Sequence, residues 1–257
     1  MKLTLSAPES ALLAACVTLL LVACLGPALA HPGHYHQFAD QRTWLGIPCA
    51  LDVLSNLPFA VWGCIGLRTL HCAELGSMPA AQRQMATLFF AGLILTAAGS
   101  SWYHWQPDDA GLALDRLSMV VAFAGLLGLA AAGRISARAG LALGVATLLW
   151  GPISVAVWSR TGNVLPWALV QFGGMALVLW LASRPPLAGA LPVHWGMVIV
   201  IYAAAKLLEQ GDHQVYQLLG HTLSGHSLKH LIAGLAAWPI WSAIRAMQAS
   251  RRVAHRP

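Results

Sequence analysis

Charged side chains are scarce in this sequence of 257 residues. Asp, Glu, Lys and Arg make up 9% of the chain, against roughly 25% in an ordinary soluble domain. Hydrophobic residues make up 58%, and the mean hydropathy is +0.64. A soluble fold of this length cannot bury that much apolar surface. The composition therefore excludes a soluble globular protein and indicates an integral membrane protein.

Cysteine is also rare, and its spacing excludes two further classes of structure. None of the five cysteines is spaced like the ligands of a structural zinc site. Two of them, Cys16 and Cys24, fall within the N-terminal leader, so a disulfide framework is not expected. We predict that Cys49, Cys64 and Cys72 are small apolar packing residues.

The long apolar stretches lack the alternation of polar and apolar residues that marks membrane-spanning strands. Each stretch is about 20 residues long, the length of helix that crosses a ~30 Å hydrocarbon core. We therefore predict an all-α integral membrane protein, a seven-transmembrane helix bundle over residues 49–245. The predicted spans are 49–68, 86–105, 111–132, 140–158, 164–183, 191–209 and 225–245.

Residues 1–30 have the layout of a secretory signal, with a basic residue, an apolar run and small residues before His31. We predict cleavage after Ala30. Leu21-Val22-Ala23-Cys24 also resembles a bacterial lipobox, which would place cleavage before Cys24 and a lipid on it. The third alternative is a signal anchor that is retained as an eighth helix.

Lys and Arg fall mainly on one side of the predicted bundle, which sets its orientation. If His31 is outside, seven of the nine acidic residues are on the outer side and ten of the fifteen basic residues are cytoplasmic. We therefore predict a multi-pass protein of the cell membrane, of the bacterial inner-membrane type, with residues 31–48 exoplasmic and the basic tail, 246–257, cytoplasmic. The net charge of +6 is then a topology signal rather than a nucleic-acid-binding surface. The cytoplasmic basic residues are Lys2, Arg68, Arg83, Arg134, Arg138, Arg184, Arg245, Arg251, Arg252 and Arg256.

Ionisable side chains inside a bilayer are costly, so each of them suggests a function. In this topology His104 lies at the outer end of the second predicted helix, and Asp115 lies at the outer start of the third. His226 and His230 lie at the outer start of the seventh. Three segments that are distant in sequence therefore bring polar groups to one membrane depth, near the exoplasmic face.

The spacing of His226 and His230 places both imidazoles on one face of a helix, where they can bind one metal ion. His104 supplies a third ligand. Three protein ligands leave the fourth position of a zinc ion to water, as in catalytic sites. Imidazoles also suit iron, nickel and copper. The alternative is that these histidines lie at the membrane interface and make ordinary hydrogen bonds.

Ser100 precedes His104 by one helical turn, on the same face, and Ser101 has a similar claim on chemical grounds. Asp115 could orient a ligand or accept a proton from metal-bound water. The alternatives are structural. Ser100 would be a small residue at a helix contact, and Asp115 would pair with Arg116 or Lys229.

These motifs together resemble the alkaline ceramidase family of intramembrane zinc amidases, which belongs with the adiponectin-type receptors in a superfamily of seven-helix proteins. The resemblance is carried by Asp40-Gln-Arg-Thr-Trp-Leu-Gly-Ile-Pro and Leu51-Asp-Val-Leu-Ser-Asn-Leu-Pro58, and by Gly99-Ser-Ser-Trp-Tyr-His104, Asp115-Arg-Leu and Ser224-Gly-His-Ser-Leu-Lys-His230. It spans about residues 38–245. Each motif is short, but their order and spacing together are specific.

The resemblance implies that His104, His226 and His230 bind Zn²⁺, and that Ser100 and Asp115 hold the zinc-bound water and polarise the scissile amide. It further implies a hydrolase of membrane lipids that cleaves a ceramide-like amide in sphingolipid metabolism. Eukaryotic members also have an acidic calcium-binding cluster, and Cys49 stands where they have a glutamate. We therefore do not expect calcium binding.

Several outer residues have weaker claims to function. The His31-Pro-Gly-His-Tyr-His36 segment can capture copper, nickel or zinc, but short histidine tracts are usually tails with incidental affinity. We expect Asp52, Ser55 and Asn56 to make contacts and hydrogen bonds between helices. Lys206 and Glu209 are expected to snorkel or to pair.

Two other classes of function compete with the enzyme. A receptor or sensor of the adiponectin-receptor kind would use its zinc structurally, and a long cytoplasmic domain would favour it. A metal permease would need a polar path through the bilayer, yet the inner halves of the predicted helices carry almost no ionisable residues. The membrane-lipid amidase therefore fits the sequence best.

Overall fold

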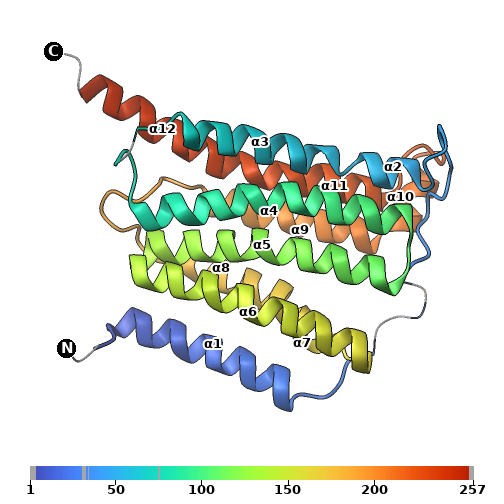
Figure 1. Ribbon diagram of the computed structural model, residues 1–257, viewed down its shortest axis with the longest axis horizontal. Helices are drawn as coiled ribbons and strands as arrows, with labels where there is room; N and C mark the ends of the chain where they lie inside the picture. Colours follow the sequence, from blue (N-terminus) through green and yellow to red (C-terminus); the bar gives the residue numbers. More distant parts are fainter. Residues whose placement is uncertain (1–3, 31–32, 34, 75, 255–257) are drawn as a thin grey trace.

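The computed structural model describes residues 4–30, 33, 35–74 and 76–254. Figure 1 shows an elongated bundle whose long helices lie side by side along one axis. Across the described ranges, β-structure is limited to two isolated bridges, Ala30–Asn163 and Trp44–Ile47. The helices are α1 (Ala7–Leu25), α2 (Ala50–Leu54), α3 (Leu57–His71), α4 (Ala80–Trp105), α5 (Asp109–Arg134), α6 (Ala137–Thr161), α7 (Leu165–Ala168), the π-helix η1 (Leu169–Gly173), α8 (Gly174–Ala182), α9 (Trp195–Gln210), α10 (Asp212–Leu218), α11 (Gly225–Gly234), the 3-10 helix η2 (Leu235–Ala237) and α12 (Trp238–Ala254).

Within the described ranges, six helical segments are long and apolar enough to cross a membrane. They agree with the predicted all-α membrane protein. One is α1, in the predicted leader, and the other five correspond to the first five predicted spans. The sixth predicted span is α9, which has only 16 residues, and the seventh is interrupted by η2. The seven-helix count and the signal segment therefore stay predictions.

Apart from shifts of a few residues at the helix ends, two features differ from the sequence prediction. The final helix runs to Ala254, into the segment 246–257 that was expected to be a tail. Arg, Gln and Ala favour helix, whereas hydropathy marks only where the apolar residues stop. The predicted span 164–183 contains the π-helical turn Leu169–Gly173. Hydropathy does not detect such a turn, because the composition stays apolar through it.

Helices α4 and α5 pack closely because glycines lie at their contact. A Cβ atom added to Gly92 would lie 2.2 Å from the backbone nitrogen of Ala122. One added to Gly125 would lie 2.2 Å from that of Phe89. Small residues allow this approach of membrane helices. The contact holds the end of α4, with His104, against the start of α5, with Asp115.

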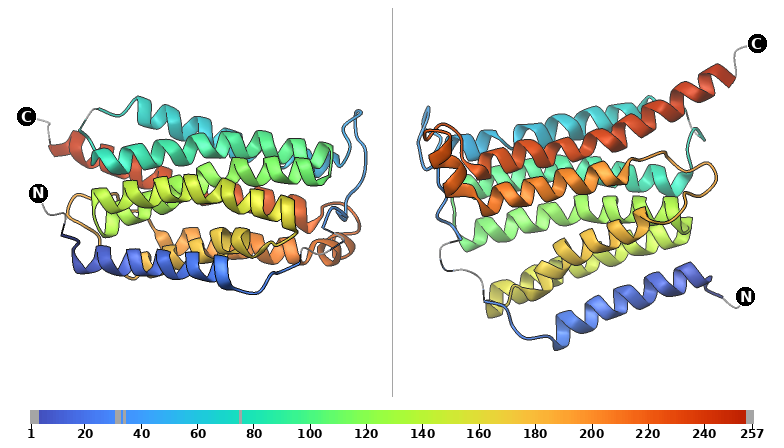
Figure 2. Two further views of the ribbon diagram at one scale, coloured as in Figure 1. Left: turned by 60° about the horizontal axis from the view of Figure 1, so that its bottom comes forward. Right: turned by 180° about the vertical axis from the view of Figure 1, so that it is seen from behind.

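Helix α1 lies along the outside of the bundle (Figure 2). Glu9, in its first turn, pairs with Arg138 and accepts a hydrogen bond from Ser136 at the start of α6. After α1, the backbone nitrogen of Leu29 donates to Asn163 Oδ1 at 3.0 Å. Polar contacts therefore join both ends of the α1 segment to the bundle.

Candidate metal centre

Three imidazoles converge at one end of the bundle. His104 is in the last turn of α4, and His226 and His230 are in the first turns of α11. Their ring centroids are 4.7 to 4.9 Å apart, and one ligand atom from each ring lies within 4.8 Å of the others. All three are buried. Among the described residues, this is the group of three or more possible ligands that could hold a metal ion. The metal-binding part of the sequence prediction is therefore supported, whereas the identity of the metal stays a prediction.

The start of α11 is built to hold its two histidines in place. Ser224 is the N-cap residue, and its hydroxyl accepts a hydrogen bond from the Ser227 backbone at 2.9 Å. A Cβ atom added to the next residue, Gly225, would lie 2.3 Å from the carbonyl oxygen of Leu208. Glycine therefore lets α11 begin directly against the end of α9. The four-residue spacing then turns both imidazoles toward His104.

The ring nitrogens of the triad fit a metal ion. Both nitrogens of His104 and Nε2 of His230 are buried without a hydrogen-bond partner. Nδ1 of His230 contacts the Ser55 hydroxyl at 2.8 Å, which fixes the ring and leaves Nε2 toward the centre. Buried polar atoms normally have partners, so a cation between the rings accounts for the orphaned nitrogens. An all-imidazole set suits zinc, and also copper, nickel or iron.

His226 is held by two neighbours that differ in kind. Its backbone nitrogen donates to Asp212 Oδ1 at 2.8 Å, and its Nε2 is 2.9 Å from Lys229 Nζ. Lys229 in turn donates to Glu209 Oε1 at 2.9 Å. A metal ion bound at Nε2 of His226 would use the lone pair that now accepts a hydrogen bond from Lys229.

Ser100 and Asp115 lie beside the triad, as predicted. Together with His230 they line a cavity of about 60 Å³ between α4, α5, α9 and α11. Oδ1 of Asp115 is buried without a partner, and its carboxylate interacts with the Ser100 hydroxyl. Ser101 instead donates to the carbonyl of Val53 at 3.2 Å, so it joins α4 to α2. The geometry therefore distinguishes Ser100, which lines the cavity, from Ser101, which joins two helices. The roles of both serines and of Asp115 stay predictions.

The other ionisable groups near Asp115 make contacts of their own. Lys206 and Lys229 both pair with Glu209. This confirms the expected pairing of Lys206 with Glu209. Arg116 lies over the Trp158 ring, 4.1 Å from its centroid. Asp115 lines the cavity together with Lys206, Glu209 and Lys229.

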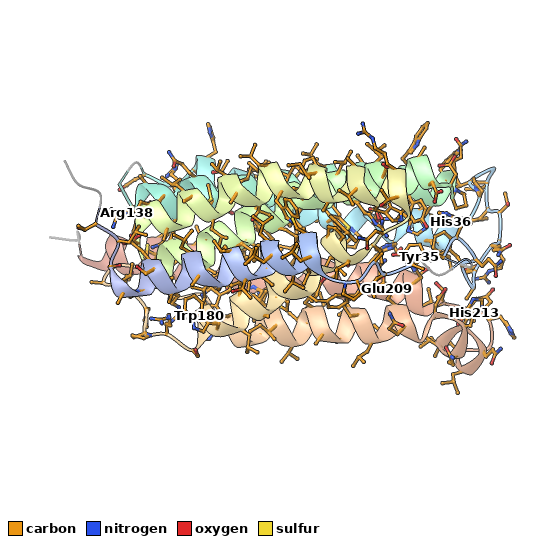
Figure 3. The ribbon with its side chains drawn as sticks, turned by 90° about the horizontal axis from the view of Figure 1, so that it is seen from below. Tyr35, His36, Arg138, Trp180, Glu209 and His213 are labelled. Atoms are coloured by element: carbon orange, nitrogen blue, oxygen red, sulfur yellow. The ribbon has the colours of Figure 1, made fainter. Side chains whose placement is uncertain are left out.

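An N-terminal segment covers the outer side of the triad. The Phe38 ring lies 4.5 Å from the His104 ring and 4.8 Å from the His226 ring, between centroids. The backbone of the next residue, Ala39, donates to Asp212 Oδ2 at 2.9 Å. Figure 3 shows Tyr35, His36 and Glu209 toward this end of the molecule, opposite Arg138 and Trp180. Phe38 therefore packs against two of the three imidazoles.

Charge also stabilises this covering segment. Burial raises the pKa of the Asp40 carboxyl, but the Arg42 guanidinium more than offsets it, so the pKa lies below its usual range. Arg42 donates to both carboxylate oxygens, at 2.8 and 2.6 Å, and to the carbonyl of Thr222. Burial raises the pKa of Tyr35 above its usual range. His36 contacts Tyr103 and Asp109, whereas His31, Pro32 and His34 lie outside the described residues.

Sequence reasoning missed several residues that hold the site. Asp212 was noted only as an outer acidic residue, and Phe38 was not noted. Ser55 was assigned to interhelical hydrogen bonds, but it also contacts a member of the triad. Asp52 accepts from the hydroxyls of Ser224 and Ser227, at 3.0 and 2.6 Å. Ser224, an N-cap residue directly before Gly225-His226, was a usable signal, whereas nothing local in the sequence marks the partners of Asp212.

A scan against models of known protein families finds no match to this chain, and a search of the curated proteins finds none either. The resemblance to alkaline ceramidases therefore rests on the motifs alone, and it enters the functional argument as a hypothesis.

Proposed function

We propose that this protein is an intramembrane zinc-dependent amidohydrolase that cleaves a lipid amide. The observation that carries the proposal is the buried triad of His104, His226 and His230, with unpartnered ring nitrogens, beside Ser100 and Asp115 in one cavity. These are the five positions that the resemblance to alkaline ceramidases marks for catalysis. A purely structural site would need no carboxylate in the same cavity with one oxygen left without a hydrogen-bond partner.

The chemistry divides between the ion and the residues around it. Zinc, when bound, would polarise a carbonyl and lower the pKa of water to about 7. Asp115 is placed to accept a proton from the attacking water and to return it to the leaving nitrogen. The Ser100 hydroxyl can donate a hydrogen bond to the amide oxygen as negative charge develops there. Ser55 would hold the imidazole of His230 in position during the reaction, and Asp212 would hold the backbone of His226.

A lipid amide is the substrate class that the surroundings favour. The Phe38 ring covers two of the three imidazoles, which favours entry of a substrate from within the membrane. A larger cavity of about 300 Å³ lies between α1, α6 and η1, with an almost entirely apolar lining. Val170 lines this larger cavity, whereas its neighbour Gln171 lines the smaller cavity beside the triad. The apolar lining of the larger cavity suits an acyl chain.

We further propose that the site faces the exoplasmic side of the cell membrane and that the protein acts in bacterial lipid metabolism. The support is the asymmetry of Lys and Arg together with the motif resemblance. A ceramide-like substrate is the corresponding expectation from the family.

The proposal is tested by metal analysis and lipid-amide hydrolysis on the same purified samples. We expect about one zinc per chain, lost when His226 or His230 is replaced by alanine, and zinc-dependent release of fatty acid from a lipid amide. Wild-type protein that folds but holds no metal would overturn the zinc model. Wild-type protein that holds zinc but cleaves no lipid amide would favour the receptor with a structural zinc.

A further inference from the structure

Two lysines share one carboxylate at the edge of the candidate metal centre. Lys206 and Glu209 are on α9, Lys229 is on α11, and both ammonium groups contact Glu209. Their side chains are only 16–21% exposed. Two partly buried ammonium groups therefore share one direct carboxylate partner. A ligand carboxylate in the cavity would give them a second one.

The cluster opens into the same cavity as the candidate catalytic residues. Lys206, Glu209 and Lys229 line it together with Ser100, Asp115 and His230. At about 60 Å³, the cavity holds a small polar group such as a carboxylate, but no acyl chain. It therefore fits the head of a lipid rather than its tail.

Further hydrogen-bonding groups line the wall of this cavity. Tyr202 is on α9, one helical turn before Lys206, and its hydroxyl is buried without a hydrogen-bond partner. Gln171 is in the π-helical turn η1, and it lines the same cavity. Turns of this kind occur often at functional sites. Tyr202 and Gln171 can donate hydrogen bonds to an anionic oxygen beside the lysines.

The charges around the triad also favour an anion once a divalent ion is bound. Even with all four carboxylates ionised, three cations and a divalent metal leave the whole group with one net positive charge. The nearby pair of Asp40 and Arg42 is neutral and does not alter this balance. The cations are Arg116, Lys206 and Lys229, and the carboxylates are Asp52, Asp115, Glu209 and Asp212.

We propose that the lipid amide cleaved here carries a carboxylate in its head, as an N-acyl amino acid does, and that Lys206 and Tyr202 receive this carboxylate. This inference rests on the proposed hydrolase, and it narrows the substrate from a neutral ceramide-like amide to an anionic one. Water adds across the amide C–N bond, the nitrogen takes a proton, and the products are a fatty acid and a free amino acid. The lysines hold the amino-acid carboxylate while the acyl carbonyl lies beside Ser100.

Binding of a matched pair of lipids tests the proposal without requiring turnover. N-palmitoylglycine and N-palmitoylethanolamine differ mainly in ending in a carboxylate or a hydroxyl. Their dissociation constants are measured by calorimetry in one detergent, on zinc-loaded Ser100→Ala protein, which keeps all the charges but is expected to turn over slowly. We expect the glycine amide to bind at least ~10-fold more tightly, equivalent to about 1.4 kcal/mol. Equal affinities would overturn the proposal.

Four variants, made in the same Ser100→Ala protein, locate the charge that discriminates between the two lipids. Lys206→Gln should abolish the preference while leaving the affinity for the ethanolamide unchanged, and Lys206→Arg should retain it. Arg160→Gln, which removes an exposed cation from the end of α6, is the matched control and should also retain it. Tyr202→Phe should weaken the preference in part, so a test remains if Lys206→Gln fails to fold. A preference that survives both Lys206→Gln and Tyr202→Phe would overturn the assignment.

Two outcomes distinguish failure of this proposal from failure of the hydrolase on which it rests. If wild-type protein cleaves both amides equally well, the hydrolase stands and the anionic-head proposal fails. If the glycine amide binds preferentially through Lys206 but no lipid amide is cleaved, the carboxylate site stands and the hydrolase fails. Free palmitate is measured alongside them. Palmitate that depends on Lys206 as strongly as the glycine amide does would assign the cations to the fatty-acid product and overturn the substrate proposal.

Discussion

Ser55 is the side chain that fixes the orientation of His230. Its hydroxyl contacts Nδ1 of the imidazole at 2.8 Å and donates to the carbonyl of Asp52 at 3.0 Å. Because partners of this kind orient ligands and tune their basicity, we expect Ser55→Ala to weaken zinc binding by ~10–100-fold. Competition with a fluorescent zinc chelator measures the change.

Ser101→Ala is the matched control for Ser55, since it also removes one serine hydroxyl bonded to a backbone carbonyl of α2. It should leave zinc affinity unchanged. Equal zinc affinity in Ser55→Ala and wild-type protein would show that the hydrogen bond to His230 does not tune the metal site.

Variants of Asp115 and Ser100 test catalysis separately from metal binding, because neither residue belongs to the triad. Asp115→Asn keeps the shape of the side chain but cannot accept a proton, so hydrolysis should fall by ~10²–10⁴-fold. Ser100→Ala removes a donor to the developing oxyanion and should cost ~10²–10³-fold. Both variants should retain zinc, measured on the samples used for kinetics. Wild-type rates in zinc-loaded variants would contradict both role assignments.

Among single residues, the sequence predicted those whose chemistry is unusual for a bilayer. His104, Asp115, His226 and His230 stand out because ionisable groups are expensive there. Phe38 and Asp212 do not stand out, since a phenylalanine near a membrane and an acidic residue in an outer loop are ordinary. Their roles arise from tertiary contacts, the Phe38 ring against two histidines and Asp212 against two backbone nitrogens.

Among the helices, α1 is either a signal that is cleaved or an anchor that is retained. Glu9 is buried, and it pairs with Arg138 and Ser136 of the bundle. Cleavage after Ala30 would remove this partner from Arg138. The contact therefore favours retention, and we expect the intact mass of the purified protein to include residues 1–30.

A variant of Glu9 gives an independent measurement of the same choice. If α1 is retained, Glu9→Gln should lower the melting temperature of the purified protein, and Arg138→Gln should lower it similarly. Glu74→Gln is the matched control, because Glu74 is in the loop between α3 and α4. A mass that begins at His31, with no effect of Glu9→Gln on the mature protein, would support the cleaved signal instead.

The positions of the long helices follow from hydropathy, but their interruptions do not. The predicted spans 86–105 and 111–132 lie within α4 and α5, which begin or end a few residues beyond them. By contrast, the π-helical turn after Pro166 and the 3-10 turn before Trp238 leave no mark in the apolar pattern. They depend on how neighbouring helices pack, and a single sequence does not encode that in its hydropathy.

For the whole molecule, the charges at the two ends of the bundle predict its orientation in the membrane. Asp108, Asp109 and Asp212 lie at the end that holds the triad. Arg134 and Arg138 flank the turn between α5 and α6 at the opposite end, and Arg83 lies near the start of α4 at that end too. Because Lys and Arg are retained on the cytoplasmic side, the triad should face the exoplasmic side.

Labelling of single cysteines in intact cells tests this orientation. In a background in which the native cysteines are replaced, Asp108→Cys should react with a membrane-impermeant maleimide added from outside. Ser136→Cys, at the turn between α5 and α6, should react only after the membrane is permeabilised, and so should a tag at residue 257. Labelling of Asp108→Cys only after permeabilisation would invert the topology. The triad of histidines would then face the cytoplasm, and the charge argument would fail even if the enzyme proposal survived.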